Sequence, residues 1–208
     1  MNVDIADTFT KGTRYIDMVK AGLILVLDVI SDIVDISKIK AGMMEESNNV
    51  VQLKRSIDEC LIMVQERIDR SELNLSIYIA DILPSLVADR ARIKQIILNV
   101  LSKSSKFTLK GGSSEVRATI NVLGQRKIVV KNTGFGIAEE DILLVFQPFG
   151  QARENFANTY EGTYLGLLAV NHLTEMHQVR IELKSLLNQG TCVTLCFPES
   201  LIESVLKA

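Results

Sequence analysis

The 208-residue chain contains no tryptophan and has only two histidines, three prolines and three cysteines. Cys60, Cys192 and Cys196 are odd in number and lack the spacing of a zinc site, so we expect a reduced, cytoplasmic protein. Cys192 and Cys196 lie in the alternating apolar run TCVTLCF, which favours core packing over metal binding. A disulfide-stapled or zinc-dependent domain is therefore not expected.

Strong charge of one sign is also absent. The formal net charge of -2 gives no global basic field, so a nucleic-acid partner is not expected. The most apolar stretch, AGLILVLDVISDIVDIS, is interrupted by three aspartates, whereas a membrane span needs about 20 apolar residues with few or no charges. The first residues, MNVDIADTFTKG, lack the apolar region of a signal peptide.

What the chain does have is a globular composition, 47% hydrophobic and 23% charged, and a long apolar stripe near its start. Residues 13–42 predict one helix with apolar residues at steps of three and four. Such a helix must pack on another helix, so we expect a homodimer or a partner docked through 13–42. The residues expected at this contact are Leu23, Val26, Leu27, Ile30, Ile33 and Val34.

The remainder alternates between helical and strand patterns. Helices are predicted over 48–70, from the capping residue Asp89 to about 105, over 139–145 and over 165–176. Strands are predicted over 73–80, 115–123, 127–132, 179–185 and 191–197, and a polar loop over 150–161. The prediction is an α+β protein: a helical segment 1–45, an α/β sandwich with a mixed sheet over 46–200, and a tail over 201–208.

Five short motifs occur in a familiar order. The chain has ADRARIKQIILNVLSKSSKFT from residue 88, KNTGFGI from 131, VFQPFGQ from 145, EGTYLGL from 161 and GTCVTLCFP from 190. Together they resemble the N, G1, F and G2 boxes and the closing strand of bacterial two-component histidine kinases. DISKIKAG, from residue 35, resembles the end of the second helix of their dimerisation hairpin. The resemblance implies the ATP-binding sandwich shared with gyrase, Hsp90 and MutL.

The resemblance also implies which residues would contact a nucleotide. Asn99 matches the first N-box asparagine and is the one catalytic candidate if the protein is active. Lys106 matches a phosphate-contacting lysine, and Phe107 an adenine-packing aromatic. The full set of implied nucleotide-site residues is Asn99, Lys103, Lys106, Phe107, Asn132, Gly134, Gly136, Gly162, Thr163, Tyr164, Gly166 and Leu167.

Three of these positions depart from the family pattern. Lys103 stands where a second asparagine helps to hold Mg²⁺, and a cation there would repel the metal, although it could contact a phosphate directly. Asn132 replaces the aspartate that accepts a hydrogen bond from the adenine amino group; its oxygen could still accept, without charge assistance. Tyr164 replaces a glycine of the phosphate loop, where positive φ and close backbone approach are needed. The Gly-Gly pair usual after the following helix is Gln178-Val179, which predicts a sturdier strand start there.

A phosphoacceptor histidine is the other element that the resemblance requires. No histidine precedes His172, and about a dozen residues before the long helix would span roughly 18 Å as a helix, too little for a partner helix. We therefore expect no H box, unless a first helix lies upstream of residue 1. His172 and His177 are expected to be structural or solvated.

Three functions compete on these observations. The favoured hypothesis is a degenerate histidine-kinase-like protein that contacts a response regulator or a histidine kinase, with weak or no ATP binding and doubtful Mg²⁺ binding. The alternative is the ATP-binding part of a histidine kinase that transfers the γ-phosphoryl group in trans. A third is a histidine phosphotransferase, through His172, or an anti-sigma-type relative of the same fold.

Overall fold

A five-stranded mixed sheet forms the framework of the protein. The computed structural model describes residues 47, 49–121, 124–147 and 165–201, with ten single residues of the N-terminal segment between Gly12 and Ser37. The sheet has the order β2-β4-β5-β7-β6; β2 runs parallel to β4, and the other neighbours are antiparallel. The strands are β2 (Asn74–Ile79), β4 (Ser113–Ile120), β5 (Arg126–Asn132), β6 (Arg180–Leu186) and β7 (Gly190–Phe197). The predicted mixed sheet is confirmed.

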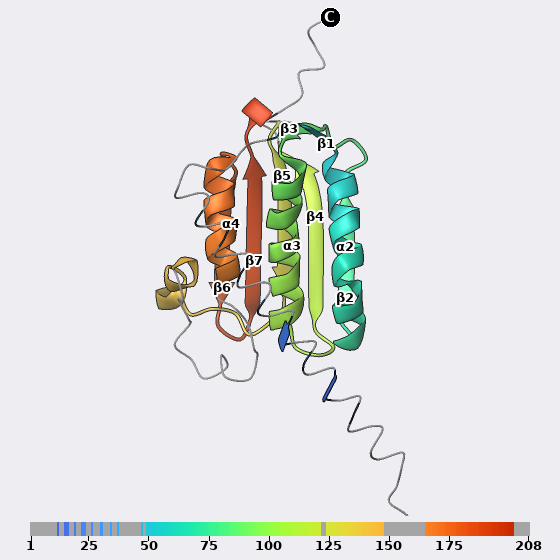
Figure 1. The fold of residues 1–208 in the computed structure, drawn as a ribbon, viewed down its shortest axis with the longest axis vertical. Helices are drawn as coiled ribbons and strands as arrows, with labels where there is room; N and C mark the ends of the chain where they lie inside the picture. Colours follow the sequence, from blue (N-terminus) through green and yellow to red (C-terminus); the bar gives the residue numbers. More distant parts are fainter. Residues whose placement is uncertain are drawn as a thin grey trace, which may run out of the picture.

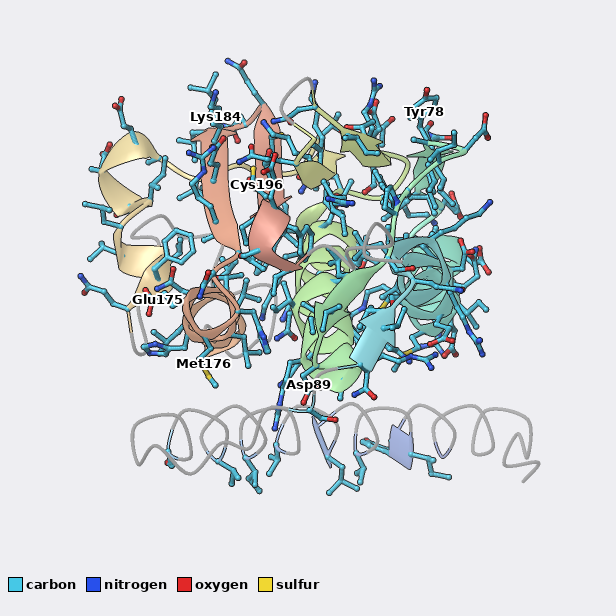
Figure 2. All side chains as sticks on the ribbon, turned by 90° about the horizontal axis from the view of Figure 1, so that it is seen from above. Tyr78, Asp89, Glu175, Met176, Lys184 and Cys196 are labelled. Atoms are coloured by element: carbon cyan, nitrogen blue, oxygen red, sulfur yellow. The ribbon has the colours of Figure 1, made fainter. Side chains whose placement is uncertain are left out.

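Three helices cover one face of this sheet: α2 (Leu53–Arg70), α3 (Arg90–Phe107) and α4 (Leu165–Met176) (Figure 1). Strand side chains alternate between the faces, so Leu195 and Phe197 of β7 lie in the core beneath the helices. Figure 2 shows Tyr78, Lys184 and Cys196 on the opposite side of the sheet. Cys196 is therefore buried, as expected, but outside the main core, and Cys192 on the same face is half-buried.

Two short strands were not predicted. β1 (Asn49–Val51) pairs antiparallel with β3 (Leu86–Ala88), so the expected helix over 48–70 begins only at Leu53. The three-residue segment Asn49–Val51 is too short to show a period, and its partner strand lies more than 30 residues away. The helix expected over 139–145 is instead two 3₁₀ turns, η1 (Glu139–Asp141) and η2 (Leu144–Phe146). A third turn, η4 (Glu199–Leu201), ends the described chain.

Hydrogen bonds close the start of α3 and the end of α4. Asp89 caps α3 as predicted, since its carboxylate accepts hydrogen bonds from the backbone N–H groups of Ala91 (2.9 Å) and Arg92 (3.1 Å). After α4, Gln178 adopts a left-handed φ of 54°, and the Val179 N–H donates to the Thr174 carbonyl at 2.8 Å. The expected strand start at 178–179 was wrong: the turn of the family persists without glycine.

A charged cluster ties α2 to α3. The Glu59 carboxylate lies 2.8 Å from Lys94 Nζ, 2.7 Å from Arg90 Nη2 and 3.0 Å from Arg55 Nε. These three cations, with Lys94 first, lower the pKa of Glu59 to about 2. Because the folded-state pKa lies below the ordinary value of 4.5, the cluster stabilises the fold above about pH 4.5. That stabilisation is lost as the pH falls toward 2.

Glu59→Gln is accordingly expected to lower the urea midpoint at pH 7, with the difference from wild type shrinking between pH 4.5 and 2. Urea unfolding at several pH values measures this. Glu66→Gln is the matched control, because Glu66 pairs only with Arg70 of its own helix and both side chains are more than 70% exposed. A Glu59→Gln effect that stays constant down to pH 2 would refute the cluster's role.

The apolar stripe of the N-terminal segment is exposed. Leu23, Val26, Ile30 and Val34 are helical and 43–60% exposed, as expected for a face without a partner in the chain. Leu27 and Ile33, also predicted for this face, lie outside the described residues. No helix within the described part of the chain combines the length and apolar character that a bilayer crossing requires.

Candidate functional site

One face of α3 carries the first group of site residues. Asn99, Lys103 and Lys106 are separated by four and three positions, so their side chains share a face of the helix. Asn99 Nδ2 is buried and donates no hydrogen bond to any residue that the structure describes. A buried, unpaired amide donor costs about 1–3 kcal/mol, a cost that a ligand acceptor would remove. This donor is the strongest sign of a ligand site in the described residues.

Two lysines follow Asn99 on that face. Lys103 and Lys106 are both half-buried, and Lys106 Nζ lies 5.6 Å from the centroid of the Phe107 ring. Two ammonium groups one turn apart favour an anion such as phosphate. They disfavour a hard cation, which needs neutral or anionic oxygen ligands.

The loop after β5 brings the second group of residues to the end of α3. The Phe135 N–H donates to the Phe107 carbonyl at 3.2 Å, which joins the G1-like loop to the last residue of α3. Gly134 is required at this contact, since a Cβ there would lie 2.0 Å from the Phe107 carbonyl oxygen. Asn132, Gly134 and Phe107 are therefore neighbours, although Asn132 lies 25 positions after Phe107 in the sequence.

The same loop is anchored to the β6–β7 turn. The Ile137 N–H donates to Ser185 Oγ at 2.8 Å, and the Asn188 N–H donates to the Phe135 carbonyl. Gly136 has a φ of 70°, and a Cβ there would lie 1.9 Å from the Leu186 carbonyl oxygen. Ser185 was missed by sequence reasoning, because nothing local in its strand shows which loop will reach it.

The third group lies on α4, which packs against α3. Gly166 is in the first turn of the helix and Leu167 is half-buried. Gly162, Thr163 and Tyr164 lie outside the described residues, as does the predicted loop over 150–161. His172 is 26% exposed with Nδ1 3.6 Å from a Glu175 oxygen, whereas His177 is buried, so both are structural or partly solvated as expected.

These contacts test whether a nucleotide and its metal fit. The buried Asn99 donor, the lysine pair and the glycine-bounded loop fit a phosphate-bearing ligand. The metal does not fit equally well. Lys103 supplies a positive charge where an oxygen ligand is expected, and the described residues contain no group of three His, Cys, Asp or Glu placed to hold a metal ion.

Comparisons with known proteins identify the family of the chain. Residues 88–201, more than half of the chain, match the family described as "Histidine kinase-, DNA gyrase B-, and HSP90-like ATPase". The chain is 37% identical over 175 residues to the non-motile and phage-resistance protein of Caulobacter vibrioides, covering 83% of this chain and 21% of that protein. It is 31% identical over 183 residues to the cell-division control histidine kinase PdhS of Brucella canis, covering 83% and 18%.

Solved structures give the same fold. ShkA in complex with AMPPNP matches with a TM-score of 0.74 and 22% identity, over 89% of this chain and 38% of that one. The histidine kinase ThkA in complex with the response regulator protein TrrA matches with a TM-score of 0.68 and 20% identity, over 89% and 50%.

The chain spans only a fifth to a third of the length of the first curated relatives, at 21%, 35% and 18%. Its match to the family model nevertheless includes the N-box helix, the G1-like loop and the closing strand. The chain therefore belongs to the histidine kinase-, DNA gyrase B- and HSP90-like ATPase family, with an ATP-binding domain of histidine kinase type.

Proposed function

We propose that this chain is a degenerate histidine-kinase-like module that acts by protein–protein contact and binds ATP weakly, without productive Mg²⁺. The observation that carries the proposal is the placement of Lys103 on the same face of α3 as Asn99 and Lys106. Phosphoryl transfer depends on metal ions that neutralise charge on the β- and γ-phosphates. A lysine would supply a single positive charge to a phosphate, less than the charge that a divalent metal ion would supply there.

The other site changes point the same way. The oxygen of Asn132 already accepts the Gly134 N–H at 2.9 Å, and it is uncharged, so the site lacks the carboxylate acceptor that the family offers to adenine. Tyr164 puts a bulky residue where the family has a phosphate-loop glycine. We assign to this weakened nucleotide site the twelve residues that the resemblance implies, of which Asn99 is the first and Leu167 the last.

Contact with other proteins is proposed through the N-terminal stripe. Its apolar side chains are exposed in the single chain, and an exposed helical stripe of this kind is typical of helix bundles. A homodimer through 13–42 is the first candidate, and a response regulator or a histidine kinase is the partner class that the family suggests. The proposed division is a helical segment over 1–45, a sandwich over 46–200 and a tail over 201–208.

The second candidate is an active kinase domain that transfers the ATP γ-phosphoryl group in trans. Asn99 Nδ2, which is buried and has no partner among the described residues, favours it, because a donor left for a ligand has no evident use in a purely structural module. Transfer through His172 ranks third, since that side chain is 26% exposed and lies beside Glu175.

Calorimetric titration with ATP, with and without Mg²⁺, separates the first two candidates. For the wild-type chain we expect weak binding that Mg²⁺ leaves unchanged within about twofold, because Lys103 repels the metal. Lys103→Asn should introduce Mg²⁺-dependent tightening of about tenfold, equivalent to about 1.4 kcal/mol.

The control is Lys110→Asn, which removes a lysine that lies beyond the end of α3 and pairs with Glu72. It should behave like wild type. Clear tightening by Mg²⁺ in the wild-type chain would contradict the degenerate module and favour the active kinase.

A further inference from the structure

The amide of Asn132 is held in one orientation. Asn132 is the last residue of β5, its side chain is 7% exposed, and its Oδ1 accepts the Gly134 N–H at 2.9 Å. A backbone N–H can only donate, so the atom that it meets must be the amide oxygen and not the nitrogen. This short Asx turn therefore fixes which branch of the amide faces the loop.

The other branch is a donor. Asn132 Nδ2 forms no hydrogen bond with any residue that the structure describes. An aspartate in the same turn would keep one oxygen on the Gly134 N–H and have its second oxygen, an acceptor, on the other branch. Asparagine has an N–H₂ group on that branch instead. The group on this branch is thus a donor where an aspartate would have an acceptor.

This change bears on the purine that the site can read. Adenine carries an amino group at C6, which is a donor, whereas guanine and hypoxanthine carry an oxygen at C6, which is an acceptor. A donor that faces the C6 amino group leaves two donors opposed, and each loses its hydrogen bond. A donor that faces the C6 oxygen forms one. The second lone pair of Asn132 Oδ1 can also accept the N1–H that a 6-oxopurine has and adenine lacks.

We propose that Asn132 gives the base site a preference for 6-oxopurine nucleotides, those of guanine and hypoxanthine, over adenine nucleotides. The inference rests on the proposed function only in that the site binds a nucleotide at the family's position. It also gives a physical reason for weak ATP binding: the base edge is mismatched, in addition to the altered metal position. Asn132 acts here as a specificity-determining residue.

The test compares ATP, GTP and ITP in calorimetric titrations of the full chain without Mg²⁺. ITP lacks the 2-amino group of guanine, so it differs from ATP at C6 and N1 alone. We expect GTP and ITP to bind at least about tenfold more tightly than ATP. Asn132→Asp should reverse this order, because its second oxygen accepts from an amino group and repels a carbonyl. The wild-type comparison needs no variant, so a misfolded Asn132→Asp would not spoil it.

The outcomes separate the inference from the proposed function. Tighter binding of ATP than of ITP by the wild-type chain would overturn the inference alone, since Oδ1 would then be reading the adenine amino group. Equal affinity for ATP and ITP would also overturn it. Failure of all three nucleotides to bind either protein at millimolar concentration would overturn both the inference and the proposal of a weak nucleotide site.

Discussion

Replacing Val26 and Ile30 together with aspartate is expected to convert a dimer of this chain into monomers. Both residues are helical, and their side chains are 53% and 52% exposed in the single chain. In a bundle each would be buried, and a buried Val or Ile side chain contributes about 1.5–3 kcal/mol. Four aspartates in one dimer interface should therefore weaken the dissociation constant by at least about 100-fold. Sedimentation velocity over a range of concentrations measures this.

A matched control separates assembly from general surface polarity. Ile62 is 75% exposed and belongs to α2 of the sandwich, not to the N-terminal stripe, so Ile62→Asp should leave the oligomeric state unchanged. Neither variant should lower the unfolding midpoint of the sandwich, because none of the three residues belongs to its core. A wild-type chain that sediments as a monomer at every concentration would contradict the proposed homodimer and leave a second protein as the partner.

Gly136→Ala is expected to destabilise the sandwich by about 3 kcal/mol or more. A left-handed φ of 70° costs a non-glycine residue about 1–2 kcal/mol, and overpacking typically adds about 1–3 kcal/mol. Here the new Cβ would lie 1.9 Å from the Leu186 carbonyl oxygen, so the backbone itself must move. For a chain of this size the melting temperature should fall by roughly 6–12 °C, measured by differential scanning calorimetry.

Gly111→Ala measures the cost of the left-handed φ alone, so the difference between the two variants gives the steric part of the Gly136→Ala effect. Gly111 has nearly the same φ, 77°, but a Cβ there would meet nothing within 4 Å. Its alanine variant should lose only about 1 kcal/mol. Equal losses at the two positions would show that the contact between the G1-like loop and the β6–β7 turn is not tightly packed. Any surviving Gly136→Ala protein should also bind nucleotide more weakly, since the displaced loop carries Asn132 and Gly134.

The local sequence pattern was sufficient to predict a helix or strand where the segment itself contains a capping residue or a clear apolar period. Asp89 marked the start of α3, and the apolar periods located α4 and the hairpin of β4 and β5. The local pattern gave the wrong element where the conformation of a segment depends on a contact with residues far away in the sequence. Val51 pairs with Leu86, so 49–51 became a strand, and the segment predicted as a helix over 139–145 became two short turns, the second of which packs against α4. Gln178 kept the turn of the family because backbone hydrogen bonds to α4 hold it there.

The sequence by itself determined the family, because five motifs occur in the family's order. It also determined the departures at 103, 132 and 164, because residue type alone decides whether a position can ligate a metal or readily adopt positive φ. Only the tertiary structure decided which of the described groups meet. It joined Phe107 to the loop at Gly134, left Asn99 Nδ2 buried without a partner among the described residues, and fixed the Asn132 oxygen on the Gly134 N–H. Hydrogen-bond direction depends on which atoms meet in space, and no spacing along the chain encodes it.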